Sequence, residues 1–237
     1  MTQFNTTETV TVDDGLQDFL LKVFTQMGIG LLITTVVAWI GYNSLATGGM
    51  LSALFGSSFV SLILIVVQLG FCIALSAGLT KFSTAVCTGL FYGYALITGI
   101  TFSVLPYTYD FSTLFTAFGF AAIMFASCAV IGRTTKVDLT RFSGLLFGAL
   151  IAMALATLAS LFIPALRQTL IISYIGVILF LALTAFDVQK LKNFYYQADG
   201  QLQSNLAVYG AFQLYLDFIN LFLQILRIVA RNRSNRK

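Results

Sequence analysis

Charged side chains are scarce in this chain of 237 residues, in which Asp, Glu, Lys and Arg together make up 9%. A soluble domain carries about 25% charged residues, which cover its water-facing surface. With 58% hydrophobic residues and a mean hydropathy of +0.91, the chain is suited to lipid as its main solvent. The shortage of charge therefore excludes an ordinary water-soluble globular domain.

Proline is rare and histidine is missing, since the chain has two Pro and no His. Few Pro in long apolar runs favour helices over a membrane barrel, whose strands would alternate in polarity. The three cysteines, Cys72, Cys87 and Cys128, all lie in apolar runs without metal-ligand spacing, and we interpret them as small buried hydrophobic residues. We therefore expect no bound cofactor, and the net charge of +4 lies mostly near helix ends, which indicates membrane orientation rather than nucleic-acid binding.

Seven windows are apolar over about 20 residues, the length that crosses the hydrocarbon of a bilayer. The sequence therefore predicts an all-α, polytopic membrane protein with a polar N-terminal tail (1–26), a seven-helix transmembrane domain (27–228) and a basic C-terminal tail (229–237). Gly48-Gly49, Pro106 and Pro164 mark breaks between windows. The windows are 27–46, 57–79, 83–105, 111–132, 142–163, 169–195 and 205–228.

Two further patterns concern packing. The segment 14–26 predicts a short amphipathic helix on the membrane surface, since apolar residues share one of its faces. Two GxxxG pairs predict close approach of helix backbones in lipid. The residues of the apolar face are Leu16, Phe19, Leu20 and Val23, and the glycine pairs are Gly89 with Gly93 and Gly144 with Gly148.

Two acidic residues lie inside predicted apolar helices, whereas most of the other charged residues lie in loops or near helix ends. Asp187 is in the sixth window and Asp217 in the seventh. An acid at mid-helix costs roughly 2.5–3.5 kcal/mol on insertion scales, so such residues usually mark pathways, proton sites or paired contacts. At 1.5 Å per residue the two lie roughly 12 and 18 Å below the same surface, so adjacent antiparallel helices would bring them together.

Two nearby carboxylates do not readily both ionise, so we expect Asp187 and Asp217 to share a proton and to act as a proton sensor. The alternative is two separate acids, each bonded to its neighbours or to Lys190. On the seventh window, Gln213, Asp217, Asn220 and Gln224 are spaced 4, 3 and 4, which places them on one helix face. This polar ladder suits a pore lining, and it equally suits plain hydrogen bonding between helices.

The sequence has no HExxH, GxSxG or P-loop signature, so we predict that the protein is not an enzyme. An intramembrane aspartyl protease would also use two membrane aspartates. Its family usually shows YD and GxGD motifs, whereas Asp187 follows Ala185-Phe186 with no Gly.

Several motifs resemble the Bax inhibitor-1 family, and the resemblance spans nearly the whole chain. The two motifs that bear the aspartates are long and specific. The motifs are Tyr174-Ile175-Gly176-Val177 leading into Thr184-Ala185-Phe186-Asp187-Val188-Gln189-Lys190-Leu191-Lys192, then Leu214-Tyr215-Leu216-Asp217-Phe218-Ile219-Asn220-Leu221-Phe222-Leu223, then Thr134-Thr135-Lys136-Val137-Asp138-Leu139, and Gly30-Leu31-Leu32.

The resemblance implies a seven-helix bundle with the last helix central, and a pH-sensitive calcium leak gated by the Asp187 and Asp217 pair. Calcium and protons would then be partners of these two residues, with Gln213, Asn220 and Gln224 as candidates for the pore lining. Some family members pair an aspartate with an Arg on the second helix. Here that window has no charge, and the polar candidates are Gln68 and the flanking Lys81.

A second function remains open beside the leak channel. Other relatives bind a membrane protease or suppress cell death, so the chain is alternatively a non-conducting membrane regulator that binds another membrane protein. Short tails and short loops suit a multi-pass protein of a bacterial inner membrane, with the lipid bilayer as its constant partner.

Basic residues predict the orientation, because cytoplasmic loops carry an excess of Lys and Arg. The N-terminal side carries seven, the opposite loops one, and the C-terminal tail five. We therefore expect a cytoplasmic N-terminus. The seven are Lys22, Lys81, Arg133, Lys136, Arg141, Lys190 and Lys192, the one is Arg167, and the five are Arg227, Arg231, Arg233, Arg236 and Lys237.

This orientation makes a prediction for topology reporters. Fusions after Arg141 and after Arg167 should report opposite sides of the membrane, with Arg141 cytoplasmic, and a cytoplasmic signal after Arg167 would contradict the orientation. With seven full crossings the five basic residues of the tail lie on the far side, and with a re-entrant last segment they join the cytoplasmic side. A fusion at Lys237 separates these two arrangements.

Overall fold

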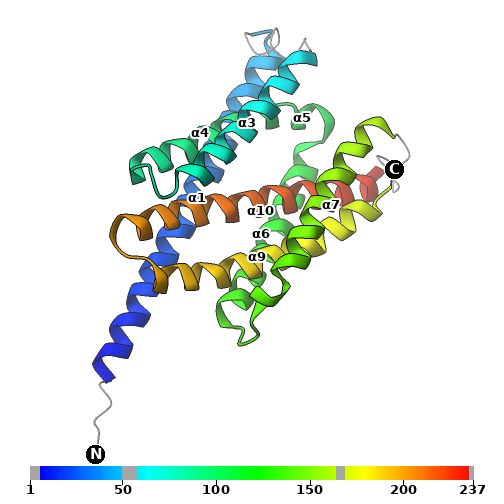
Figure 1. The fold of residues 1–237 in the computed structure, drawn as a ribbon. Coiled ribbons are helices and arrows are strands. Elements are labelled where there is room, and N and C mark those ends of the chain that lie inside the picture. The colour runs from blue at the N-terminus through cyan, green and yellow to red at the C-terminus, as the bar shows by residue number, and fades with distance from the viewer. Residues whose placement is uncertain (1–5, 50–57, 164–168, 235–237) are drawn as a thin grey trace, which may run out of the picture. The chain divides into compact units, whose positions relative to one another are not determined.

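The computed structural model describes residues 6–49, 58–163 and 169–234, and within these ranges it contains helices and no strand. Figure 1 shows their order along the chain. The elements are α1 (Thr6–Ala46), α3 (Ser58–Gly78), α4 (Thr84–Phe102), α5 (Leu105–Thr108), α6 (Phe111–Thr134), the 3₁₀ helix η1 (Leu139–Phe142), α7 (Ser143–Phe162), α9 (Ile171–Gln197) and α10 (Gly200–Ser234).

The prediction of an all-helical membrane protein is confirmed for the described ranges. Six segments are long and apolar enough to cross a bilayer, and the described apolar part of α3, Ile63–Gly78, is shorter than the others. Length and composition thus support six of the seven predicted spans. The six are Asp14–Ala46, Thr84–Thr108, Phe111–Thr134, Leu139–Ser160, Ile171–Gln197 and Gly200–Ser234.

Two of the predicted breaks lie in described residues. Gly48 has a φ of +70°, a left-handed conformation that glycine adopts without strain, and it follows the end of α1. Pro106 does not end the third window as we predicted, because α4 already ends at Phe102 and Pro106 lies inside α5. A proline is tolerated in the first turn of a helix, where its missing N–H is not needed. The third, Pro164, is outside the described residues.

The chain divides into two compact units. One unit comprises Met1–Leu105 with Leu191–Phe212, and the other comprises Pro106–Lys190 with Gln213–Lys237. The long helices α9 and α10 therefore each contribute one part to each unit.

In the first unit, α4 packs against both α1 and α3. The hydroxyl of Thr34 on α1 donates to the carbonyl of Ala95 on α4 at 3.0 Å. Near this bond Gly99 lies so close to α1 that an added Cβ would come within 2.7 Å of Val37 Cβ. A small residue at this position thus allows the two helix backbones to approach, as helix packing in lipid requires.

The N-terminal part of α1 also belongs to the first unit. The predicted apolar face is real, because Leu16, Phe19, Leu20 and Val23 are all buried. The predicted short helix is wrong, since these residues belong to one helix that runs without a break from Thr6 to Ala46. The Phe19 ring packs against Tyr195 at a centroid distance of 5.6 Å. The apolar face is thus covered by protein.

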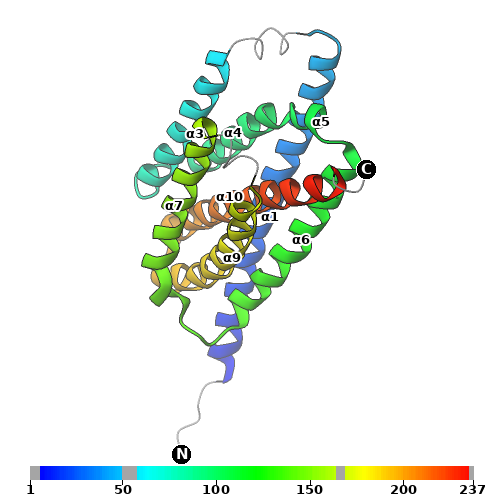
Figure 2. The same cartoon turned by 90° about the vertical axis from the view of Figure 1, so that its right-hand side faces the viewer.

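In the second unit, α6 and the C-terminal part of α10 run antiparallel. Phe218 packs against Phe118 and Phe125 of α6, with ring centroids 5.4 and 5.6 Å apart. Later along α10, Arg233 reaches the first turn of α6, where it forms an ion pair with Asp110 at 3.3 Å. Figure 2 shows this end of α10, in red, beside the start of α6, in green.

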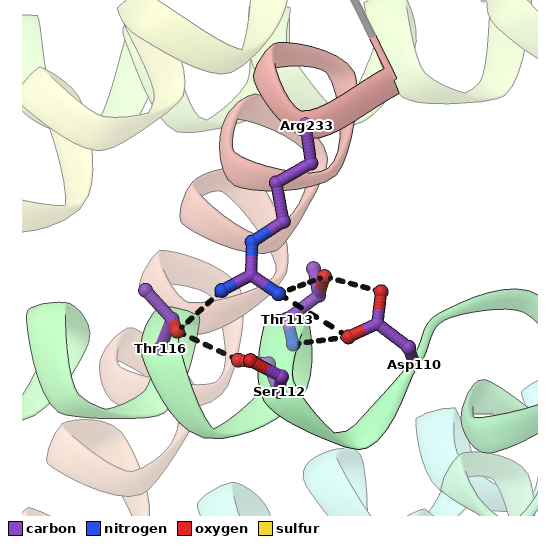
Figure 3. A network of polar contacts seen from close by, with 5 residues as sticks. All are labelled: Asp110, Ser112, Thr113, Thr116 and Arg233. Carbon is purple, nitrogen blue, oxygen red and sulfur yellow. Dashed lines mark hydrogen bonds and ion pairs between the residues drawn. The ribbon is translucent and has the colours of Figure 1, made fainter. Parts of the chain in front are cut away.

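Arg233 is held by two hydroxyl groups in addition to Asp110. Its guanidinium donates to the hydroxyls of Thr113 and Thr116, each at 3.1 Å (Figure 3). Asp110 also caps α6, because its carboxylate accepts from the backbone N–H of Thr113 at 2.7 Å. α10 is one unbroken helix, Gly200–Ser234, and its C-terminal end lies beside the start of α6.

Small residues behave differently in the two predicted GxxxG pairs. Gly93 does pack closely, because an added Cβ would come within 2.7 Å of the Phe71 ring. No atom of the described residues lies within 4 Å of such a Cβ at Gly144 or Gly148, so the packing predicted for that pair is wrong there. The tightest approach in the second unit is instead at Gly132 on α6, which faces the backbone carbonyl of Ala185 on α9.

The contact at Gly132 generates a prediction with a matched control on the same helix. The Gly132→Ala substitution should lower the thermal stability of the detergent-solubilised protein, because forcing backbones apart costs about 1–3 kcal/mol. The control is Gly119→Ala on α6, where no described atom is within 4 Å and alanine should be neutral or stabilising by up to about 1 kcal/mol. Equal melting temperatures for the two variants would contradict the close contact.

Candidate functional site

The structure brings the two membrane aspartates together. Asp187 on α9 and Asp217 on α10 both belong to the second unit and are 8% and 6% exposed. Their carboxyl groups are close enough for each to influence the charge of the other. The predicted meeting of the two acids is therefore found, and their role as a proton sensor stays a prediction. Lys190, one turn further along α9, also interacts with Asp187 by charge.

The closeness of the two carboxyl groups constrains their chemistry. An ionised carboxylate can only accept, so a hydrogen bond between the two would require a proton on one of them. With both acids ionised, two negative charges would face each other away from water, which is strongly unfavourable. A proton on one of the two acids removes this repulsion.

Backbone packing holds the part of α9 that carries Asp187 against α6. Gly132 lets α6 touch the α9 backbone at Ala185, two residues before the acid. On the same turn, the Thr184 hydroxyl is buried and donates to the carbonyl of Phe180 at 2.7 Å. This bond satisfies the threonine inside its own helix, and the aspartate remains the acidic group that α9 presents to Asp217.

The polar ladder of α10 is enclosed to different depths. Asp217 and Gln224 are buried, whereas Gln213 and Asn220 are half-buried. Most of the apolar positions between them are buried as well, with Leu216 and Leu223 half-buried. Of the most apolar stretch of α10, 72% is buried, against 50% for α9 and 6% for α7. Protein therefore covers Asp217 and Gln224, and it covers Gln213 and Asn220 in part.

Two oxygens of this ladder have no hydrogen-bond partner in the described protein. They are Asp217 Oδ2 and Gln224 Oε1. A buried polar atom without a partner costs about 1–3 kcal/mol, so such atoms need an explanation. Asn220 differs from them, since its Nδ2 donates to the carbonyl of Leu216 at 2.8 Å.

Gln189 joins the site to the loop between α6 and α7. Its Nε2 donates to the carbonyl of Val137, and its Oε1 accepts from the backbone N–H of Leu139, both at 2.7 Å. In the same loop, the Thr140 hydroxyl and backbone N–H hold the pKa of Asp138 below its usual range. One side chain, two residues after Asp187, thus fixes the loop against α9.

The sequence did not predict the contacts that Gln189, Gly132 and Gly176 make in the structure. Gln189 and Gly176 lie in quoted motifs, and nothing in their spacing shows which backbone or side chain they contact. The two substitutes considered for an Arg on the second helix lie in the first unit. Gln68 donates to the Thr98 hydroxyl at 3.2 Å, and Lys81 is exposed after α3.

The described residues assemble no cluster of three or more His, Cys, Asp or Glu that would hold a metal ion. The calcium interaction considered for Asp187 and Asp217 would therefore rest on two carboxyl groups from protein. Calcium takes six to eight oxygen ligands, so amide oxygens, carbonyls or water would have to supply the others.

Comparisons with known proteins agree with the motifs. The family described as "Inhibitor of apoptosis-promoting Bax1" matches residues 16–234. The chain is 42% identical to "Inner membrane protein YbhL" of Escherichia coli (strain K12), over 92% of this chain and 94% of that protein. It is also 35% identical to an uncharacterised protein of Borreliella burgdorferi (92% and 93% covered) and 30% identical to one of Rickettsia prowazekii (97% and 96% covered).

The two hydrogen bonds between Gln189 and the loop that joins α6 to α7 generate a prediction for hydrogen exchange. Gln189→Leu removes the acceptor of the Leu139 amide, so peptides that cover residues 135–142 should exchange faster. Stability should fall by about 1 kcal/mol per lost hydrogen bond. The same substitution at exposed Gln197 on α9 is the control and should leave exchange in this loop unchanged. Unchanged exchange in Gln189→Leu would show that the loop is held by other contacts.

Proposed function

This chain belongs to the Bax inhibitor-1 family, and we propose that it is a pH-sensitive calcium leak channel. The gate of this channel is the pair of Asp187 and Asp217. The observation that carries the proposal is the direct interaction of two buried carboxyl groups on neighbouring helices of membrane-spanning length. Such a pair changes its charge when a proton is lost, which is the local event that a pH-operated gate requires.

The gate would work through the packing of α9 against α10. With one proton shared, the carboxyl groups attract and hold the helices together. Loss of that proton leaves two negative charges in contact, and repulsion between them favours separation or entry of a cation. Calcium and protons would then compete for the same oxygens, with calcium binding more strongly as the pH rises.

The number of protein ligands suits passage rather than storage. Two carboxylates are too few to replace the hydration shell of calcium, so an ion held there would keep part of its water. Gln213, Asn220 and Gln224 extend oxygen-bearing side chains along the same face of α10, and we propose them as the lining. Calcium is thus the transported substrate of the protein and not a resident cofactor.

We also propose the finer architecture: seven crossings, with α10 as the central helix and the N-terminus in the cytoplasm of a bacterial inner membrane. The high burial of α10 supports a central place. The name of the Escherichia coli relative supports the location. The Arg233 contact with Asp110 supports a C-terminal tail on the side opposite the N-terminus, since the loop before α6 lies there after three crossings.

The aspartate pair is proposed as a gate and not as a protease dyad. The residues before Asp187 are Ala185 and Phe186, and they lack the glycine of the GxGD motif that intramembrane aspartyl proteases use. The protein is therefore proposed to be no enzyme.

The test is calcium flux in liposomes that contain the purified protein. Asp187→Asn or Asp217→Asn keeps the shape of the side chain and fixes it in a neutral state, so either should alter flux and flatten its pH dependence. The double variant should add little, because the pair acts as a unit. Asp199→Asn, at an exposed aspartate between α9 and α10, is the control and should keep the wild-type profile.

Two results would count against the proposal in different ways. If wild type conducts and both single variants keep its pH profile, the channel exists and the shared-proton gate is wrong. If wild type conducts nothing at any pH, the channel itself is wrong, and a non-conducting regulator of another membrane protein becomes the better proposal.

A further inference from the structure

Gln224 occupies a place in the second unit that glycine makes possible. The side chain is 7% exposed and lies against Gly176 on α9. A Cβ added to Gly176 would come within 2.8 Å of Gln224 Cγ and 2.9 Å of its Cδ. A side chain at this position would displace the glutamine, so the absence of one at Gly176 leaves room for the Gln224 amide.

The amide in this seat presents an acceptor without a protein donor. Gln224 Oε1 is buried and has no hydrogen-bond partner among the described residues. Plain hydrogen bonding between helices, the alternative interpretation of the ladder, would have given this oxygen a donor. A buried acceptor of this kind is satisfied by water or by a cation, and it repels anions.

Acceptor oxygens recur along this face of α10. Asp217 Oδ2 has no protein donor, and Asn220 uses its amide N–H on the carbonyl of Leu216, which leaves its oxygen as the remaining polar group. Gln224 lies seven residues beyond Asp217, or about 10 Å along the helix. Such a series of oxygens without cationic side chains between them is the chemistry that a hard cation prefers.

We infer that Gln224, seated over Gly176, is a second station for a partly hydrated cation, between the aspartate pair and the C-terminal end of α10. This inference rests on the proposed channel and adds to it a specific residue, a specific neighbour and a direction. Gln224 is uncharged, so it would bind the ion only weakly. The pH dependence of the flux would be set by Asp187 and Asp217.

The first test does not require conduction. In a background with Cys72, Cys87 and Cys128 replaced by alanine, Gln224→Cys should react with a small water-soluble thiol reagent, and calcium should slow the reaction. Leu221→Cys, one turn away and 0% exposed, is the matched control and should react far more slowly. Equal rates at the two positions, or a rate at position 224 that calcium does not change, would overturn the station.

The second test measures calcium flux in liposomes. Gln224→Leu should lower flux by about ten-fold, the loss expected for one interaction with a charged group, and should keep the pH dependence. Gly176→Ala should lower flux in the same direction by displacing the amide, and the two changes together should be less than additive. Gln201→Leu, an exposed glutamine in the first turn of α10, is the control.

The outcomes separate the station from the channel. If wild type conducts and both Gln224→Leu and Gly176→Ala conduct as wild type does, the station is wrong and the channel stands. If wild type conducts nothing, the channel is wrong, and the station is then judged by the thiol reaction. Calcium-sensitive labelling at position 224 supports it in that case, and labelling equal to position 221 overturns it.

Discussion

Two acids that touch inside apolar helices are the constraint on which the second unit depends. Neither Asp187 nor Asp217 can turn to water from its buried position, and the two cannot comfortably be ionised together. The parts of α9 and α10 that carry them therefore meet inside the second unit. An apolar pair of similar size would pack at least as well, so stability alone gives no reason for two acids here.

The other contacts of the second unit position these helices around the pair. Gly132 admits the α9 backbone beside α6, Gly176 admits Gln224, and Gln189 ties the preceding loop to α9. Phe118 and Phe125 pack on Phe218, the residue after the second acid. Each contact helps to set the distances among α6, α9 and α10. A gate at the aspartates would change the distance between α9 and α10.

The end of α10 is fixed by charge and by hydroxyl groups. Arg233 is held at the first turn of α6 by Asp110 and two threonine hydroxyls. A cation beside a helix N-terminus is unfavourable by itself, and the Asp110 carboxylate offsets that repulsion.

The sequence by itself determined that lipid is the main solvent, that the spans are helices, and that two acidic residues lie inside them. Sparse charge and long apolar runs give an all-helical membrane protein, because only helices satisfy every backbone group within one segment in lipid. Mid-helix aspartates stand out because each costs energy there, and their similar depth predicted their meeting. Helix ends were less certain, since Pro106 opens a short helix, and α1 extends well before residue 27.

Only the tertiary structure decided which faces are covered and by what. Spacing alone made Gly144 and Gly148 look like a packing pair and gave no sign of Gly132 or Gly176, because a glycine's value depends on the atoms opposite it. Likewise, a polar ladder in sequence does not tell whether its oxygens find donors. That depends on neighbours from other helices, and in the described protein Asp217 Oδ2 and Gln224 Oε1 find none.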